Sequence, residues 1–375
     1  MVGHNISNPC HCHSFWPAGT CTARPLARPN SPEITRSRRI ALLVLLGASA
    51  SLEPPPCLSL DGAWACAPAP EPNATARGID VIVTHCCERL GWIQHLVAEY
   101  PRAIASVFIH SKCTGLKRAP PKCGLAGGED FSGAPVPVVA EAVADPGARS
   151  TDECGGYVHH FARRADRAGR GVVGSLALHG APQAHWNATL VRALLALAAR
   201  PASAPVLARL FFSVNQRYYE HRKFGGALRT VAGECMRSLV RAGDPARNDS
   251  RGAAALYADL PSLATFSNGQ FFVGAAAFRR RRAEIWPRAR EWLFSETARR
   301  ECPGSRRECT MLEHLWAAVL CEPCLSPPRH MDLRLPESLR VAPLAINTDP
   351  NAQTPSSATG PLWGHETRRP PRWRR

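Results

Sequence analysis

The chain has 375 residues, 45% of them apolar, and this composition excludes an intrinsically disordered protein. Its formal charge of +16 comes from 46 basic and 30 acidic residues, and nearly all of the basic excess is arginine in a background rich in Ala, Pro and Gly. The densest basic runs, residues 279–282 and 368–375, do not alternate basic and aromatic side chains as nucleic-acid surfaces do, so we predict no nucleic-acid partner.

The N-terminal part predicts entry into the secretory pathway. Residues 1–36 are polar and show no periodicity, so we expect a disordered leader. Residues 37–52 contain arginines, an apolar run and then Ala48-Ser-Ala50, which is the pattern of a signal peptide or a signal anchor. The run is shorter than the ~20 residues of a usual membrane span. Two readings stay open, a cleaved signal and an uncleaved segment that makes a single-pass type II membrane protein.

Cysteines and glycosylation motifs agree with this topology. Three of the fifteen cysteines precede the apolar run, and the twelve that follow it are an even number, as disulfides require. Asn-x-Ser/Thr motifs at Asn73, Asn187 and Asn248 all follow the run and predict glycosylation there. We therefore expect a domain in the lumen of the ER or Golgi, or a secreted one, with its cysteines largely oxidised.

Composition divides the rest of the chain into three parts. Residues 53–77 are rich in Pro and Ala and predict a flexible stem. Residues 78–330 carry the periodic patterns and predict one luminal domain. Residues 331–375 lose periodicity and end in Pro and Arg, so we expect a disordered tail.

The domain begins with a strand, a helix and a second strand. Residues 79–84 are a β-branched run, and apolar residues then recur at helical spacing until Pro101. Residues 106–110 are again apolar and predict a parallel neighbour for the first strand. We expect the apolar side chains of both strands to be buried in one sheet with Leu176 and Leu178.

Later segments continue the alternation of helices and strands. In order, they are a helix that Thr151 or Asp152 caps, a strand over residues 172–178, a helix over 190–199, a turn and strand ending at 273, and helices over 287–299 and 310–320. This alternation predicts an α/β fold, with a mostly parallel sheet flanked by helices in a single Rossmann-like domain.

Two pairs of motifs carry a family resemblance. Glu153-Cys-Gly-Gly-Tyr-Val-His-His160 precedes Leu178-His-Gly-Ala-Pro-Gln-Ala-His185, and Asn268-Gly-Gln-Phe-Phe-Val273 precedes Leu312-Glu-His-Leu-Trp316. In this order and spacing they resemble the eukaryotic domain of unknown function 3431 family. The resemblance implies a fold-sized unit without a proven activity. The chain departs from the family pattern before Glu153, where Ser-Thr-Asp replaces Asn-x-Gly-Arg, and Gly155-Gly156 weakens the predicted helix start.

The strongest candidates for chemistry are His179 and His185. His179 ends a predicted parallel strand, and ligands of open α/β sheets gather beyond such strand ends. Two histidines six positions apart across a turn can share a metal ion, orient a phosphate or act as acid and base. The plain alternative is that His179 hydrogen-bonds a loop and His185 lies on the surface.

Glu153 and His160 lie on the helix before that strand. Positions 153 and 160 fall on roughly one face of the helix, so Glu153 could orient His160 or bind substrate hydroxyl groups. A carboxylate that stabilises the first turn of the helix is an equally plain explanation.

The second half of the domain resembles glycosyltransferases of the GT-A type. Asn268 and Gln270 precede a strand, and Glu313 lies on the last helix, where such enzymes place an acidic base. No Asp-x-Asp occurs in the chain, so the usual site for Mn²⁺ and diphosphate is missing.

This resemblance implies a glycosyltransferase-like enzyme that acts on a glycan or glycoprotein, using a nucleotide-sugar donor and a divalent cation. We assign catalysis to Glu153, His179, His185 and Glu313, and substrate binding to His160, Asn268 and Gln270. The alternative is a non-catalytic carbohydrate-binding or cell-surface protein on the same scaffold.

Overall fold

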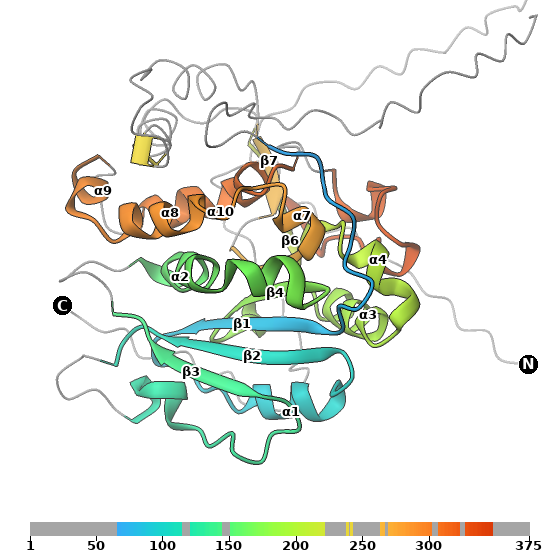
Figure 1. The fold of residues 1–375 in the computed structure, drawn as a ribbon, viewed down its shortest axis with the longest axis horizontal. Coiled ribbons are helices and arrows are strands. Elements are labelled where there is room, and N and C mark those ends of the chain that lie inside the picture. Colours follow the sequence, from blue (N-terminus) through green and yellow to red (C-terminus); the bar gives the residue numbers. More distant parts are fainter. Residues whose placement is uncertain are drawn as a thin grey trace, which may run out of the picture. The chain divides into compact units, whose positions relative to one another are not determined.

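A six-stranded sheet organises the fold (Figure 1). In the computed structural model, the described residues are 66–114, 121–144, 151–221, 238–239, 241–242, 263–266, 269–301, 307–322 and 327–347. The strand order is β3-β2-β1-β4-β8-β5. The strands span Ile79–His85 (β1), Ile104–Ser111 (β2), Val138–Ala142 (β3), Gly174–His179 (β4), Phe211–Ser213 (β5) and Phe271–Gly274 (β8).

Four neighbouring strands of this sheet are parallel. β1 pairs in parallel with β2 on one side and with β4 on the other, and β2 pairs in parallel with β3. The apolar residues of β1 and β2 are buried beside Leu176 and Leu178. Burial on both faces of a strand favours the continuous β-branched runs that the sequence shows there. The predicted α/β fold and the burial of these strands are confirmed.

The other end of the sheet is mixed. β8 runs antiparallel to both β4 and β5. The predicted strand ending at residue 273 is therefore present, and it brings Gln270, which precedes it, to the edge of the sheet where β4 ends.

Helices cover both faces of the sheet (Figure 1). α2 (Asp152–Asp166) lies on one face, and α8 (Ile285–Leu293) and α10 (Arg307–Val319) pack against it. α1 (Trp92–Glu99) and α3 (Ala188–Ala198) cover the opposite face. Two apolar cores follow, one on each side of the sheet.

The alternation of side chains along β1 separates these cores. Ile82 belongs to the core under α2, whereas Val81 and Val83 belong to the core under α1 and α3. All three side chains are fully buried. This explains why a parallel strand reads as a continuous apolar run rather than an alternating one.

The close approach of α2 to β1 requires glycine. A Cβ atom on Gly156 would lie 2.0 Å from Thr84 Oγ1, and one on Gly155 would lie 1.9 Å from Thr151 Oγ1. Gly156 therefore permits the packing of α2 on β1, and Gly155 leaves room for the Thr151 side chain at the start of α2, roles that outweigh the low helix propensity of glycine.

A small second sheet and several short helices complete the described fold. The second sheet has the order β7-β6-β9. Its strands are β6 (Arg217–His221), β7 (Leu263–Phe266) and β9 (Ala345–Asn347), and the short helices are α4 (Ala204–Leu207), α7 (Ala275–Phe278) and α9 (Glu296–Glu301).

The helix predicted over residues 287–299 is divided in two. α8 ends at Leu293, and α9 begins at Glu296. Ser295 causes the break, because its hydroxyl group donates to the Trp292 carbonyl and accepts a hydrogen bond from the Ala298 amide. Serine at such a junction caps the following helix, an effect that apolar periodicity does not reveal.

The described chain extends beyond residues 78–330 at both ends. At the start, the Ala67 amide donates to the Arg280 carbonyl over 2.9 Å. Past residue 330, Leu335 and Leu339 are buried in the core under α1 and α3. The leader, the signal or anchor segment and residues 348–375 lie outside the described residues.

Four disulfides join described residues. They pair Cys66 with Cys321, Cys86 with Cys113, Cys87 with Cys123 and Cys154 with Cys309. Several disulfides in one domain indicate an oxidising compartment of the secretory or extracellular kind. Among the described residues, no single helix is long and apolar enough to cross a membrane, although Ala188–Ala198 and Pro201–Leu207, bent by 106°, meet the same criteria together.

The glycosylation motifs have different surroundings. Asn73 is exposed, and its amide nitrogen donates to the Arg170 carbonyl over 2.9 Å. Asn187 is buried, and its side-chain oxygen caps α3 by accepting from the Leu190 amide. This burial argues against a glycan on Asn187, because the modified nitrogen must face solvent. Asn248 lies outside the described residues.

Candidate functional site

The sheet places several polar side chains at one edge. Thr84 is level with His110 of β2 and with His179 of β4, near the carboxyl ends of all three strands. The chain runs from β1 to β2 and β3 on one side of β1, whereas β4 lies on the other side. The strand order therefore reverses between β1 and β4, where ligands of open α/β sheets bind.

Three of the predicted residues meet at this reversal. His179 Nε2 lies 3.4 Å from Glu153 Oε1, and both side chains are largely buried. The rings of His179 and His185 meet edge to face, with their centroids 5.6 Å apart. The first turn of α2 and the end of β4 thus bring a carboxylate and two imidazoles together.

Glu313 joins this group from α10. Gly269 has a φ of +58°, and a Cβ atom there would lie 3.2 Å from both Glu153 Oε1 and Glu313 Cγ. The two acidic side chains therefore converge on Gly269, where any larger residue would be strained. The disulfide between Cys154 and Cys309 holds α2 and α10 in this arrangement.

The carboxylate of Glu153 is strongly stabilised. Burial by itself raises its pKa, but the charge of His179 and hydrogen bonds with His179 and Glu313 outweigh burial and lower the pKa to about 2. The opposite holds for Tyr157, because burial and the charges of Glu153 and Glu313 raise its pKa. At neutral pH, Glu153 is ionised and Tyr157 is a neutral phenol.

An amide network supports His179 from the antiparallel side of the sheet. The His179 amide donates to Gln270 Oε1 over 3.1 Å, and Gln270 Nε2 donates to Asn215 Oδ1 over 3.0 Å. Asn215 Nδ2 in turn donates to the Gln270 carbonyl over 3.1 Å. Gln270, predicted to bind substrate, therefore positions the His179 backbone. No sequence pattern identifies Asn215 as part of the site, because its position depends on the pairing of β5 with β8.

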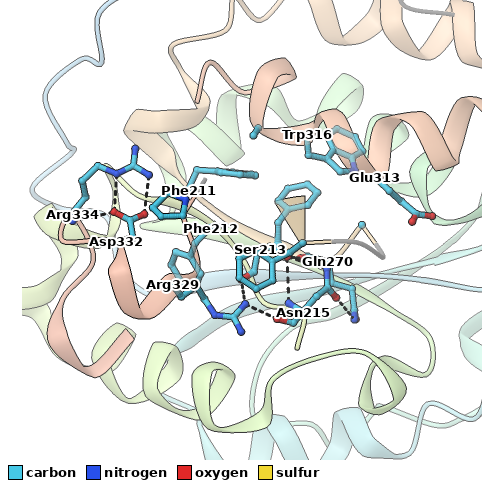
Figure 2. Close-up of a pocket in the computed structure, with 15 residues that line it drawn as sticks. Phe211, Phe212, Ser213, Asn215, Gln270, Glu313, Trp316, Arg329, Asp332 and Arg334 are labelled. Carbon is cyan, nitrogen blue, oxygen red and sulfur yellow. Dashed lines mark hydrogen bonds and ion pairs between the residues drawn. The ribbon is translucent and has the colours of Figure 1, made fainter. Parts of the chain in front are cut away.

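A pocket opens beside Glu313 and Gln270 (Figure 2). About 40 Å³ of this pocket is accessible to the centre of a water molecule, and the pocket opens to solvent. Figure 2 shows Glu313 and Trp316 on α10 above Gln270, Asn215 and Arg329. The apolar lining residues include Phe211, Phe212, Phe266 and Phe271. Aromatic walls with a few polar groups are usual for sites that bind organic ligands.

Arg329 is the most unusual residue of this pocket. Its Nη1 donates to the carbonyl groups of Ser213 and Asn215, and its guanidinium lies 4.2 Å from the centre of the Phe266 ring. Nη2 is buried without a hydrogen-bond partner. Burial lowers the pKa of Arg329 to about 9, so the side chain is still cationic at neutral pH.

His160 does not belong to this group. It is fully buried, and its Nδ1 lies 3.2 Å from His110 Nε2. Residues 153 and 160 share a face of α2, but seven residues separate them by about 10 Å along the helix axis. The predictions that Glu153 orients His160 and that His160 binds substrate do not fit this placement.

Two further predictions concern substrate binding by Asn268 and a metal ion shared by His179 and His185. Asn268 lies outside the described residues. Among the described residues, the sets of three ligand atoms within 4.8 Å of one another do not include His179 or His185. A metal ion on this histidine pair would therefore lack a third ligand from the described residues.

We expect the domain to lose stability as the pH falls below about 6.5, because buried histidines resist protonation. Burial lowers the pKa of His185 and of His159 from 6.5 to about 4. The unfolded chain gains these protons near pH 6.5, whereas the folded chain gains them only near pH 4. Urea denaturation from about pH 7 to about pH 4.5 should show up to about 1.4 kcal/mol of lost stability per pH unit for each histidine.

A matched pair of variants checks this expectation. His185→Gln removes one of the linked protons and should reduce the slope of stability against pH, whereas His95→Gln, at an exposed position of α1, should not. Stability that stays constant or rises on acidification would show that these imidazoles are protonated in the folded state.

Comparisons with known proteins identify no relative of this chain. No family model, no curated protein and no solved structure matches this chain. The resemblance to the domain of unknown function 3431 family stays a prediction, and the function of this site rests on its own geometry.

Proposed function

We propose that this protein is a glycosyltransferase-like enzyme of the secretory pathway, which transfers a sugar from a nucleotide donor to a hydroxyl group of a glycan or glycoprotein. The observation that carries the proposal is the convergence of Glu153, Glu313 and His179 beside a pocket at the carboxyl edge of the sheet. Paired acidic groups at such an edge suit the removal of a proton from an acceptor hydroxyl group.

The sheet order supports a GT-A-like layout. Doubly wound folds bind nucleotides where the strand order reverses, and here the reversal lies between β1 and β4. The antiparallel strand β8 brings Gln270 to the same edge, next to His179. A donor at the reversal and an acceptor in the pocket of Figure 2 would meet at Glu313.

The proposed reaction is a single displacement at the sugar. The ionised carboxylate of Glu313 accepts the acceptor's hydroxyl proton, because the low pKa of Glu153 makes that carboxylate a weak base, and the acceptor oxygen forms a bond to the anomeric carbon. The bond between that carbon and the donor phosphate oxygen breaks, and the nucleoside diphosphate leaves with the electron pair. Preorganised positive groups stabilise such a leaving group, and a bound divalent cation would contribute charge of the same sign.

Protein cations can supply part of that charge. The chain lacks Asp-x-Asp, but Arg329 lines the pocket with an unpartnered Nη2, and His179 lies at the strand end. Nε and Nη1 of Arg329 already donate to backbone carbonyl groups, so Nη2 is the group that could donate to a phosphate oxygen. The missing Asp-x-Asp also favours the alternative of a non-catalytic carbohydrate-binding protein on this scaffold.

Nucleotide-sugar turnover separates these functions. The full-length coding sequence would be expressed in the secretory pathway of a eukaryotic host, the purified protein incubated with a panel of nucleotide sugars and glycan acceptors, with Mn²⁺ or with EDTA, and diphosphate release measured. Glu313→Gln should reduce turnover by about 10²–10⁴-fold, the usual contribution of a general base. Glu337→Gln, at an exposed position away from the pocket, is the matched control and should keep full turnover.

Each outcome selects one account. Turnover that Glu313→Gln abolishes, with an unchanged melting temperature, supports the enzyme. Glycan binding without turnover identifies the carbohydrate-binding alternative. If neither nucleotide sugars nor glycans bind or raise the melting temperature, both accounts are overturned.

A further inference from the structure

A second cluster of ionisable side chains lies across α2 from Glu153. It consists of His110 of β2, Glu141 of β3 and His159 of α2. His110 Nδ1 lies 3.2 Å from Glu141 Oε1, and His159 Nε2 lies 3.6 Å from the same oxygen. The three atoms all lie within 4.8 Å of one another. This cluster takes no part in the proposed transfer reaction.

These three atoms make no hydrogen bond of standard geometry, although His110 Nδ1 and Glu141 Oε1 are close enough for an ion pair. His110 Nδ1, Glu141 Oε1 and His159 Nε2 are buried, and their mutual orientation does not meet the geometry of a hydrogen bond despite the short distances. His110 is fully buried, and His159 is 5% exposed. Most buried polar atoms in proteins have a well-formed partner, so three such atoms within 4.8 Å of one another are suited to a shared partner.

We propose that His110, Glu141 and His159 bind a divalent transition-metal ion, with zinc as the best match. Zinc bonds of ~2.0–2.1 Å in a tetrahedron place neighbouring ligand atoms about 3.3–3.4 Å apart. The distances of 3.2 and 3.6 Å from Glu141 Oε1 bracket this value. Two imidazoles and one carboxylate are an established ligand set for zinc, with the fourth position left for another ligand.

The neighbours of His110 and Glu141 suit metal binding. His110 Nε2 lies 3.2 Å from His160 Nδ1, so a proton on Nε2 leaves the Nδ1 lone pair for the metal. A carboxylate and two imidazoles are the residue types that supply an anionic oxygen and nitrogen lone pairs to a zinc ion.

Two arginines oppose the metal and set its affinity. Arg163 lies 3.2 Å from Glu141 Oε2, but its side chain is 59% exposed, so solvent screens its charge. Arg290 Nε donates to His159 Nδ1 over 2.9 Å, which leaves the proton of a neutral ring on Nε2. Metal binding must move this proton to Nδ1 and turn the partly exposed Arg290 away.

The ion would link three elements of the fold. The ligands come from β2, β3 and α2, so one ion would join three elements that are far apart in the chain. His110 and His179 are level on strands two places apart, which separates the proposed ion from the candidate active site by about 10 Å. Thr84 of β1 lies between His110 and His179 across the sheet.

Metal content tests the proposal directly. The full chain without an affinity tag would be purified from a secretory host, and its zinc measured by mass spectrometry before and after dialysis against EDTA. Co²⁺ would then be added, because its visible absorption reports a tetrahedral site with nitrogen ligands. We expect about one equivalent of zinc, tetrahedral Co²⁺ absorption, and a melting temperature that falls with EDTA and recovers with zinc.

Three variants decide where the ion binds. Glu141→Gln keeps the size of the side chain but removes the anion, and with His159→Ala it should lose the metal. His95→Ala, at an exposed position of α1, should keep it. Folded protein without zinc would show that the three atoms hold water instead. Metal retained in Glu141→Gln would place it elsewhere in the chain, and either result overturns the proposal.

Discussion

Replacing Cys154 and Cys309 together with alanine is expected to lower the free energy of unfolding by about 5 kcal/mol, near the upper end for native disulfides. The disulfide closes a loop with a sequence separation of 155 residues, the longest but one among the described pairs. The entropy that a disulfide removes from the unfolded chain grows with the length of the loop it closes. Removal of this disulfide therefore stabilises the unfolded state. Both residues are fully buried between α2 and α10, and alanine leaves no unpaired polar atom.

The same change should disturb the candidate active site. Glu153 adjoins Cys154, and Glu313 lies about one helical turn beyond Cys309, so the disulfide directly fixes the distance between the two acidic groups. We expect the double variant to lose any ligand-induced rise in melting temperature that the native chain shows.

The peripheral disulfide between Cys87 and Cys123 is the matched control. Its sequence separation of 36 predicts a loss of about 4 kcal/mol, without an effect on Glu153. Urea denaturation of both variants under non-reducing conditions measures the two losses. A loss below about 2 kcal/mol for the Cys154 and Cys309 variant would show that its unfolded state keeps compact structure.

Arg167→Ala is expected to destabilise the domain by about 3–5 kcal/mol at neutral pH, because it leaves the carboxylate of Asp80 buried and unpaired. Asp80 lies in the first strand and is fully buried. Arg167 Nε and Nη2 donate to its two oxygens over 2.7 and 2.8 Å. Arg167 Nη2 also donates to Ser106 Oγ, so the variant loses three hydrogen bonds.

The loss of stability caused by Arg167→Ala should be smaller at acidic pH. Burial already raises the pKa of Asp80, and Arg167 opposes this rise. Without Arg167 the pKa rises further, and the folded state then binds a proton more readily than the unfolded state does. Stability of the variant relative to native protein should therefore increase as the pH falls from neutral towards about 4.

Two companion variants isolate the buried charge as the cause. Asp80→Asn in the Arg167→Ala background should recover part of the loss, because an amide carries no charge to desolvate. Arg209→Ala breaks an exposed ion pair with Glu71 of the same 2.7 Å length and should cost less than about 1 kcal/mol. Equal losses for Arg167→Ala and Arg209→Ala would mean that burial of Asp80 does not matter.

Local patterns in the sequence were sufficient for the centre of the fold. The β-branched runs of β1 and β2 and the apolar periodicity of α1 and α3 identify these elements, because each pattern reports burial on both faces of a strand or on one face of a helix. Order along the chain then implied a parallel sheet, and His179 was correctly expected at a strand end.

Strand direction and the second sheet needed the tertiary structure. β8 has the same apolar character as β4, and nothing in its residues shows that it runs antiparallel, since direction depends on how the chain returns to the sheet. β6, β7 and β9 are short, and β9 pairs with β6 from more than one hundred residues away. Such pairings leave no local periodicity.

The same distinction applies to the sites. The sequence alone indicated Glu153, His179 and His185, because they lie near the ends of predicted elements, whereas Glu313 was indicated by the resemblance to GT-A glycosyltransferases. Their approach depends on the packing of α2 against β1 at Gly156 and on the disulfide to α10, which are long-range contacts. His110, Glu141 and His159 come from three separate elements without a motif. Only the register of β1, β2 and β3 and the position of α2 place their unpaired atoms around one point.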